Sequence, residues 1–397
     1  MLEDPPAPAT LVGSLIQALD AARPYELADV LYEHLVNNVG ARSCTVLLAD
    51  YLGEVLVPVP ADGKASTLSS QDVDGSHAGE SFREQRIVAV PSHEGSVLYL
   101  PITQRQERIG VLEVDLPRES LSAATYLEEA ARVLAYVVAS ARRYTDRFEK
   151  IRRRRDLELA AEMQWEILPV LAYSCPEYSL AGSLEPAYEI GGDTFDYAVA
   201  PHGITLTITD AMGHGLRAAM LGSLAVTSMR NTRRSGGGLV EQASRAAASL
   251  LAEFNGEFFV TGLLLTIDAP GGSAAAVNAG HVPPLLMRDG QVSPLHIAPE
   301  TPFGMFDDVT YVPERFDLLP GDRLVLVSDG MLDAAPAGGE AYGELRLYDA
   351  LAGTRELSAS ETVRRLTSAV LEHRAGKLAD DATAVVLDWH GGGRGPE

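Results

Sequence analysis

The sequence is poor in cysteine, in basic residues and in long apolar runs, and each shortage excludes a class of protein. Only two cysteines, Cys44 and Cys175, occur in 397 residues, which argues against a disulfide framework and against a thiolate metal site. No apolar run approaches the roughly 18 residues of a membrane-spanning helix, and the N-terminus MLEDPPAPAT lacks the basic and then apolar layout of a signal peptide. We therefore expect a cytoplasmic protein with no membrane partner.

Basic residues are outnumbered by acidic ones, 32 to 55, and the formal net charge is −23. A surface of this sign repels phosphates, so we expect no nucleic-acid partner. One basic cluster, RRYTDRFEKIRRRRD at 142–156, stands against the trend. We interpret it as the solvated face of a long helix, with a contact to nucleic acid or to an acidic partner as the alternative. An excess of carboxylates remains useful where cations must be held.

The length and the hydrophobic fraction of 46% allow two or three domains with ordinary cores. Residues 10–120 read as mixed α and β, because two helix-like segments precede the strand-like stretches CTVLLADY, EVLVPV, IVAVP, VLYLPI and IGVLEVDL. This order resembles a GAF domain, a small sensory module, and SVLYLPITQRQERIGVLEVDL carries the resemblance best. The resemblance implies a sensory domain, but it identifies no ligand.

Residues 121–168 are predicted to form one long linker helix that ends at Pro169. Small or apolar residues repeat every seven positions in two rows, which is the pattern of a coiled-coil seam. We therefore expect a homodimer through the linker helix, with a helix packed along its own domain as the alternative. The two rows are Leu127, Leu134, Ala141 and Phe148, and Ala130, Val137, Tyr144 and Ile151.

Residues 169–390 contain many short strands and several helices that do not alternate regularly, which predicts antiparallel sheets with flanking helices. Aspartates lie where several of these strands end or begin. Short carboxylates at the rim of a sheet can converge on hard cations such as Mg²⁺ or Mn²⁺, whereas without cations they would raise one another's pKa. A turn or cap role for each aspartate is the alternative. These aspartates are Asp193, Asp196, Asp210, Asp329, Asp380 and Asp381.

Five stretches, GGDTFDYAV, ITDAMGHGLRAAML, NAGHVPPLLM, LVLVSDGMLDA and DDATAVVL, occur in the order found in PPM-type protein phosphatases of the SpoIIE-like, RsbU-like branch. The upstream stretch AAEMQWEILP also resembles the helix that leads into such domains. The resemblance covers about 169–389. It implies an α/β (α+β) fold, an αββα sandwich of two antiparallel sheets flanked by helices, with a centre of two Mn²⁺ or Mg²⁺ ions at one end.

The resemblance also implies roles for individual residues. Asp210 would bridge the two metal ions, and the backbone carbonyl of Ala211 would bind one of them. Asp329 and Asp380 would hold the other ion. Asp193 would reach the metals directly or through water.

Four further residues match motif positions around these ligands. Asp381 would orient the ligands, and Asn278 and His281 would give structural support near the site, with proton donation by His281 as the alternative. His214 is a candidate for protonating the leaving group, although a structural turn histidine is the alternative.

The resemblance implies a metal-dependent phosphoserine/phosphothreonine protein phosphatase, regulated by the GAF-like domain. Its substrate would be a phosphoprotein such as an anti-sigma-factor antagonist, in bacterial stress or transcriptional signalling. Two alternatives stay open. One is a non-catalytic signalling scaffold that retains the fold, and the other is a hydrolase of a small phosphoester.

Overall fold

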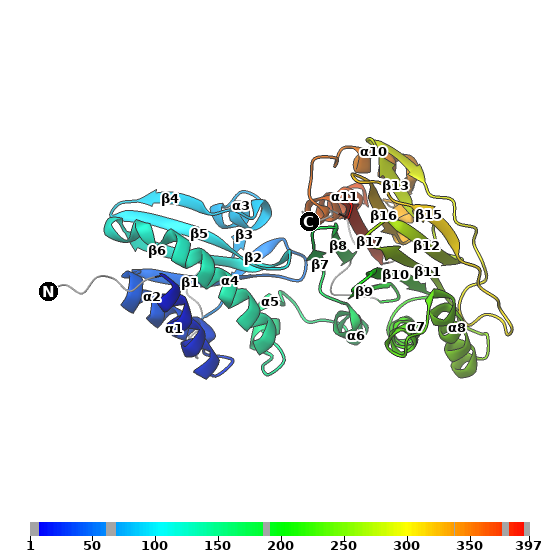
Figure 1. Ribbon diagram of the computed structural model, residues 1–397, viewed down its shortest axis with the longest axis horizontal. Coiled ribbons are helices and arrows are strands. Elements are labelled where there is room, and N and C mark those ends of the chain that lie inside the picture. Colours follow the sequence, from blue (N-terminus) through cyan, green and yellow to red (C-terminus); the bar gives the residue numbers. More distant parts are fainter. Residues whose placement is uncertain (1–7, 61–68, 186–190, 337, 375–380, 393–397) are drawn as a thin grey trace. The chain divides into compact units, whose positions relative to one another are not determined.

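The computed structural model describes residues 8–60, 69–185, 191–336, 338–374 and 381–392 (Figure 1). The chain divides into two compact units, Met1–Asp156 and Leu157–Glu397. Over the described residues no helix combines the length and the apolar character needed to cross a membrane.

The N-terminal unit is built on a six-stranded antiparallel sheet in the order β3-β2-β1-β6-β5-β4. Successive side chains of β1 point to opposite faces of the sheet. Val46 and Leu48 pack with the helices α1, α2 and α4, whereas Leu47 and Ala49 pack with α3. The elements are α1 (Pro8–Ala21), α2 (Leu27–Val39), β1 (Ser43–Ala49), β2 (Val55–Pro58), β3 (Gln71–Asp72), α3 (His77–Glu84), β4 (Val88–Ser92), β5 (Gly95–Gln104), β6 (Glu107–Pro117) and α4 (Ala124–Ala141).

The two helix-like segments and five strand-like stretches predicted for this unit are all present. A short 3₁₀ helix, Arg118–Ala123, leads from β6 into α4. The arrangement is a single sheet with helices on both faces. The resemblance to a GAF domain stays a prediction.

The expectation of one linker helix over 121–168 was wrong. The segment forms three helices, α4, α5 (Arg147–Arg152) and α6 (Leu159–Ile167), and α6 belongs to the C-terminal unit. The first row of the expected seam is buried in the core of the N-terminal unit, where Leu127, Leu134 and Phe148 are at most 2% exposed. An apolar stripe at helical spacing can be covered by any apolar surface, and here the unit's own sheet and helices cover it. The first row is therefore not available for a contact between two chains, and the homodimer stays a prediction.

The basic cluster also differs from the expected solvated face. The Arg152 guanidinium lies 4.7 Å from the ring centroid of Tyr51, and Arg152 Nε donates to the carbonyl of Ala49 at 3.0 Å. Glu149 accepts from the Tyr51 hydroxyl at 2.5 Å and pairs with Arg142. These contacts fasten α5 to β1 within the N-terminal unit.

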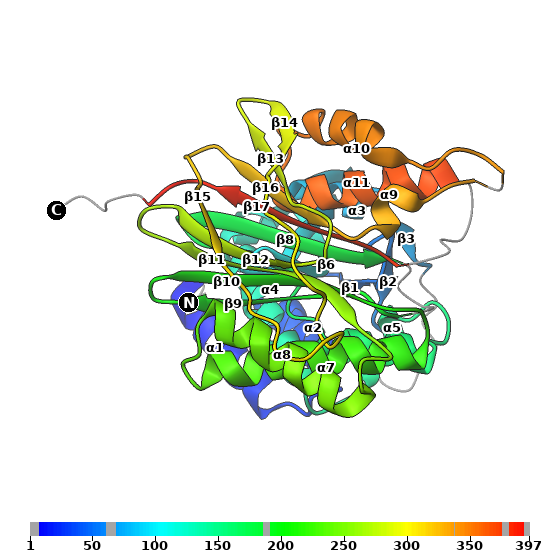
Figure 2. The ribbon, with the colours of Figure 1, turned by 90° about the vertical axis from the view of Figure 1, so that its right-hand side faces the viewer.

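The C-terminal unit is an αββα sandwich, as expected (Figure 2). Two antiparallel sheets, in the orders β15-β12-β11-β10-β9 and β14-β13-β16-β17-β8-β7, enclose a core that includes Phe195, Leu206, Leu265, Leu326 and Leu387. The strands are β7 (Ala172–Ser174), β8 (Tyr178–Glu185), β9 (Thr194–Ala200), β10 (Gly203–Ala211), β11 (Val260–Asp268), β12 (Ser273–Ala279), β13 (Leu285–Arg288), β14 (Gln291–Pro294), β15 (Glu314–Asp317), β16 (Arg323–Val327) and β17 (Ala382–Trp389).

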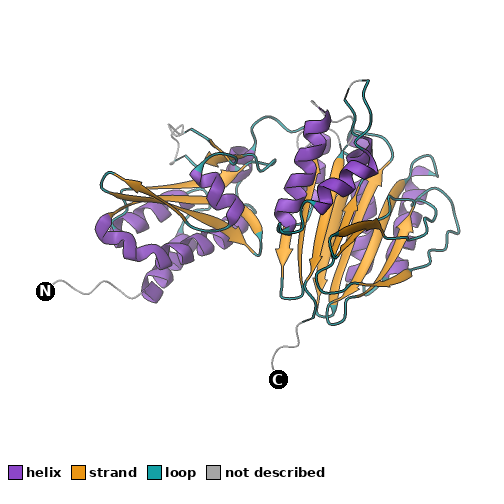
Figure 3. Cartoon of the chain, turned by 90° about the horizontal axis from the view of Figure 1, so that it is seen from above, coloured by secondary structure: helices purple, strands orange, loops and turns teal. Residues whose placement is uncertain are grey.

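Helices cover the outer face of each sheet (Figure 3). On the first sheet, Leu221 and Leu250 of the flanking helices pack against Leu264 and Val277; on the second, Leu351 and Leu366 pack around Val325. The first pair of helices is α7 (Leu216–Arg234) and α8 (Leu239–Phe254), and the second sheet carries α9 (Gly330–Asp333), α10 (Gly343–Ala352) and α11 (Ala359–Arg374).

Candidate metal centre

Asp210 lies at the end of the central ladder of the first sheet. It is opposite Thr261 on β11, and the ladder closes with the pair Ala211 and Val260. The chain then turns through Gly213 and Gly215, whose φ angles of 87° and 75° favour glycine, and enters α7. This geometry places the half-buried Asp210 carboxylate at the rim of the sandwich.

The loop before β9 comes directly against this rim. The carbonyl of Gly192 accepts from the backbone N–H of Ala211 at 3.2 Å. A Cβ on Gly192 would lie 3.0 Å from the carbonyl oxygen of Ala211 and 3.3 Å from that of Gly213, so a side chain there would require these neighbours to shift by a few tenths of an ångström. The loop thereby carries Asp193 to the end of β10.

Asp193 is buried at 3% exposure, with two other carboxylates in its surroundings. Burial raises the pKa of Asp193 well above its ordinary value, and the charges of Asp210 and Asp381 raise it further, while the Ser328 and Thr383 hydroxyls oppose the change. Asp193 Oδ2 has no hydrogen-bond partner among the described residues. A cation would supply that partner and lower the pKa again, so this all-oxygen set suits a hard divalent ion.

Asp381 holds the loop in place. Its Oδ2 atom accepts from the backbone N–H groups of Gly192 at 2.8 Å and Asp193 at 3.2 Å, and from Gln164 Nε2 at 3.0 Å. Gln164 Nε2 also donates to the carbonyl of Asp193 at 2.8 Å. These contacts fix the backbone around Asp193, and the orienting role of Asp381 toward metal ligands stays a prediction.

Gln164 is a site residue that we did not predict from the sequence. It is 3% exposed and lies on α6, on the same side as the buried residues Ala160 and Ala161. A Cβ on Gly191 would come within 2.5 Å of the Gln164 amide, which shows how closely the loop packs on this side chain. The signal available in the sequence was the single amide side chain in AAEMQWEILP, which lies on the same helix face as the small residues Ala160 and Ala161.

Asp329 follows β16 and is exposed at the first position before α9. Its segment lies beside that of Asp381, because Ser328 and Thr383 exchange backbone and hydroxyl hydrogen bonds of 3.0 and 2.9 Å. A Cβ on Gly330 would lie 1.8 Å from the carbonyl oxygen of Asp381.

Asp380 lies outside the described residues. Within those residues no group of three or more His, Cys, Asp or Glu side chains is close enough to hold a metal ion.

The turn from Asn278 to His281 is a closed local structure next to the Asp210 ladder. Asn278 Oδ1 accepts from the His281 N–H at 2.7 Å, and its amide donates to the His281 carbonyl at 3.1 Å. Nδ1 of His281 lies 3.1 Å from the hydroxyl of Thr261, the residue opposite Asp210. Burial lowers the pKa of His281 to about 4, so the ring is neutral near pH 7.

Two further residues singled out in the sequence are His214 and Asp196. His214 is exposed in the turn before α7. Asp196, which the sequence places among the acidic strand ends, points instead to α7, where it accepts from Arg230 at 2.8 Å and Arg233 at 3.0 Å. Arg230 also donates to the carbonyl of Ile167 at the end of α6, so this cluster ties α6, α7 and β9 together.

The sandwich and its rim of carboxylates define a fold of the PP2C phosphatase class. The structure titled "SiaA-PP2C domain of Pseudomonas aeruginosa" is similar over 58% of this chain and 94% of that chain, with a TM-score of 0.50 and 20% identity. Residues 200–390 match the family model described as Stage II sporulation protein E (SpoIIE). Together the sequence match and the fold support a SpoIIE/PP2C-type phosphatase domain in the C-terminal unit.

Two curated proteins are similar to this chain. Phosphoserine phosphatase RsbP of Bacillus subtilis (strain 168) is 26% identical over 248 residues, which is 60% of this chain and 59% of RsbP. Protein IcfG of Synechocystis sp. is 23% identical over 264 residues, 59% of this chain and 41% of IcfG. The chain thus matches less than two thirds of the length of either relative.

Proposed function

We propose that this protein is a metal-dependent phosphoserine/phosphothreonine protein phosphatase. The observation that carries the proposal is the buried Asp193 carboxylate, on which the charge of Asp210 acts, in a C-terminal unit whose residues 200–390 match the SpoIIE family model. A surface without a catalytic role has no need of buried carboxylates that raise one another's pKa.

In our proposal the chain's own residues supply the metal ligands. Asp210, Asp329, Asp380 and the carbonyl of Ala211 would hold two Mn²⁺ or Mg²⁺ ions, and Asp193 would reach them directly or through water. When bound, the two ions would lower the pKa of a coordinated water towards neutrality and neutralise the phosphate oxygens. Asp381 keeps the loop of Asp193 in register through the backbone hydrogen bonds described above.

A covalent cysteine mechanism is disfavoured by the state of both thiols. Burial raises the pKa of Cys44 to about 12, and burial also raises the pKa of Cys175. A thiol that stays protonated near pH 7 is a poor nucleophile. Water is therefore the nucleophile in our proposal.

The substrate we propose is a phosphoprotein, in line with the resemblance to RsbP, which is named a phosphoserine phosphatase. Within this class, an anti-sigma-factor antagonist in bacterial stress or transcriptional signalling is the substrate that the SpoIIE-like motifs suggest.

Hydrolysis of p-nitrophenyl phosphate and of a phosphoserine peptide by the full chain tests the proposal. We expect phosphate release with Mn²⁺ or Mg²⁺ and none with excess chelator, because the carboxylates alone cannot activate water. Turnover that persists in chelator would contradict the metal-dependent mechanism. If there is neither turnover nor metal binding by calorimetry, the scaffold alternative is favoured.

Regulation by the N-terminal unit has a physical route to the site in α6. This helix begins two residues after Leu157, the first residue of the C-terminal unit, and its Gln164 binds both Asp381 and the carbonyl of Asp193. A shift of α6 would therefore change the position of the loop that carries Asp193. We propose that signals from the GAF-like unit act through this contact.

Replacing Gln164 with alanine is expected to lower kcat about tenfold, as for other residues that orient metal ligands. The variant removes one of three donors to Asp381 Oδ2 and frees the loop at Gly191. Glu166→Ala on the exposed side of α6 is the matched control and should keep wild-type turnover. Metal affinity, measured by Mn²⁺ titration, should weaken in the Gln164 variant alone; equal kinetics in both variants would contradict the proposed route.

A further inference from the structure

Arg217 lies on the rim of the candidate site. It is in the first turn of α7, immediately after the turn that leaves Asp210, and its side chain is exposed. The Arg217 guanidinium lies 4.7 Å from the ring centroid of Phe258. Phe258 comes two residues before Val260, which is paired with Ala211, so Arg217 is at the same end of the β10 and β11 ladder as Asp210.

The Arg217 guanidinium lies against a packed aromatic ring and not against a carboxylate. Phe258 is packed edge-on against Phe254 of α8, with ring centroids 6.0 Å apart, and the N–H of Met212 donates to the carbonyl of Phe259 at 3.1 Å. Within the part of the chain that the structure describes, Arg217 makes no ion pair. A cation held on an aromatic face keeps its N–H groups available for an oxyanion.

The surface around Arg217 has the character of a polypeptide contact. Met212, Leu216 and Met220 are 45%, 45% and 49% exposed, and the spacing of four residues on α7 places Leu216 and Met220 on one side of the helix. Exposed apolar groups beside a basic group suit a peptide segment that carries negative charge. In a chain of net charge −23, such a basic group beside the site also counters repulsion of an acidic substrate.

We propose that Arg217 is a specificity-determining residue that binds an oxyanion of the phosphoprotein substrate. The oxyanion is either a phosphoryl oxygen or a carboxylate next to the phosphoserine, and Met212, Leu216 and Met220 contact the flanking peptide. This inference rests on the proposed phosphatase function and adds to it the recognition of an acidic phosphopeptide.

The test compares the full chain with Arg217→Ala and Arg217→Lys on three substrates: p-nitrophenyl phosphate, a phosphoserine peptide with aspartate flanks and the same peptide with alanine flanks. We expect kcat/KM for the acidic peptide to fall about tenfold in Arg217→Ala, with Arg217→Lys in between, because lysine keeps the charge but loses the planar fork. Arg234→Ala, at the exposed far end of α7, is the charge-matched control.

The pattern of loss identifies the oxyanion. A fall with all three substrates indicates a phosphoryl contact, and a fall with the acidic peptide alone indicates a carboxylate contact. Identical kcat/KM values for Arg217→Ala and Arg234→Ala on every substrate would overturn the inference. If the wild-type chain hydrolyses nothing, the phosphatase proposal fails separately. Fluorescence anisotropy with the acidic peptide and Mn²⁺ then decides: weaker binding by Arg217→Ala supports the role, and unchanged binding overturns it.

Discussion

Replacing Asp210 with asparagine is expected to reduce metal-dependent phosphate hydrolysis by at least ~10³-fold, since we propose Asp210 as a metal ligand and the loss of such a ligand costs several kcal/mol of transition-state stabilisation. The fold should persist, because Asp210 is half-buried and asparagine has nearly the same shape. The charge of Asp210 also raises the pKa of Asp193, so the substitution removes a repulsion between these two side chains in the metal-free site. Hydrolysis of p-nitrophenyl phosphate and Mn²⁺ titration would measure the loss.

The same ladder offers a control for this variant. Asp268 ends β11 at the opposite end from Asp210, where it is exposed and paired with Gly203. Asp268→Asn changes the charge by the same amount and should keep wild-type turnover. Wild-type turnover by Asp210→Asn under saturating Mn²⁺ would instead show that Asp210 is not a metal ligand.

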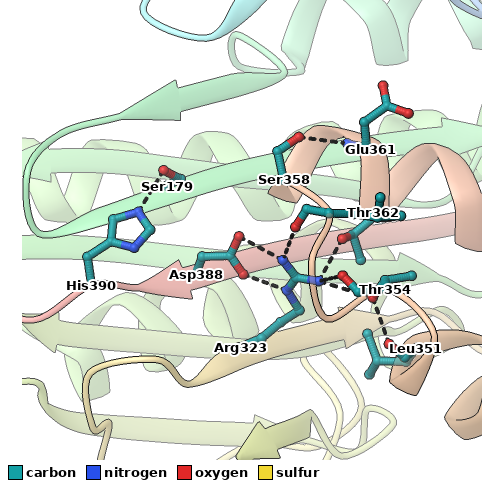
Figure 4. A network of polar contacts seen from close by, with 10 residues as sticks. Ser179, Arg323, Leu351, Thr354, Ser358, Glu361, Thr362, Asp388 and His390 are labelled. Atoms are coloured by element: carbon teal, nitrogen blue, oxygen red, sulfur yellow. Dashed lines mark hydrogen bonds and ion pairs between the residues drawn. The ribbon is translucent and has the colours of Figure 1, made fainter. Parts of the chain in front are cut away.

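Arg323 on β16 is the centre of a buried polar cluster in the C-terminal unit (Figure 4). The cluster links β16 to β17 and to α11. Arg323 is 4% exposed, and its guanidinium binds both carboxylate oxygens of Asp388, at 2.5 and 2.9 Å. It also donates to Thr362 Oγ1 at 2.7 Å and to the carbonyls of Thr354 at 2.7 Å and Leu357 at 2.6 Å. Every neighbour supplies an acceptor, so the charge is compensated within the fold.

Arg323→Met is expected to lower the free energy of unfolding of the C-terminal unit by about 3 to 5 kcal/mol, because it leaves the Asp388 carboxylate without its counter-ion. Urea denaturation followed by circular dichroism would measure the change. The double variant Arg323→Met with Asp388→Leu should lose less than the single variant, since no lone carboxylate remains. Arg355→Met removes an exposed pair with Glu356 at 3.9 Å and should change the stability by no more than about 0.5 kcal/mol. Equal effects at Arg323 and Arg355 would contradict the buried-pair argument.

Much of the fold could be predicted from the sequence, because alternation and helical spacing are local properties of the chain. The sequence predicted that Asp210 lies at the end of a strand, and β10 ends one residue later, at Ala211. The aspartates at strand ends likewise predicted a rim of carboxylates; the charge of Asp210 raises the pKa of Asp193, and the metal-binding roles of both residues stay predictions. The linker was predicted less well, since a seven-residue repeat specifies an apolar stripe but does not specify what covers it.

What the sequence by itself determined was the main strands, their antiparallel sheets with flanking helices and the place of Asp210 at a strand end. Only the tertiary structure decided which partner each face and each charge would take: Leu134 and Phe148 face their own unit, and Asp196 turns to Arg230 and Arg233. It also brought Gln164 to Asp381, which is 217 residues away along the chain. Periodicity gives the direction of a side chain relative to its own strand or helix, whereas its partner depends on the packing of elements that are distant in sequence.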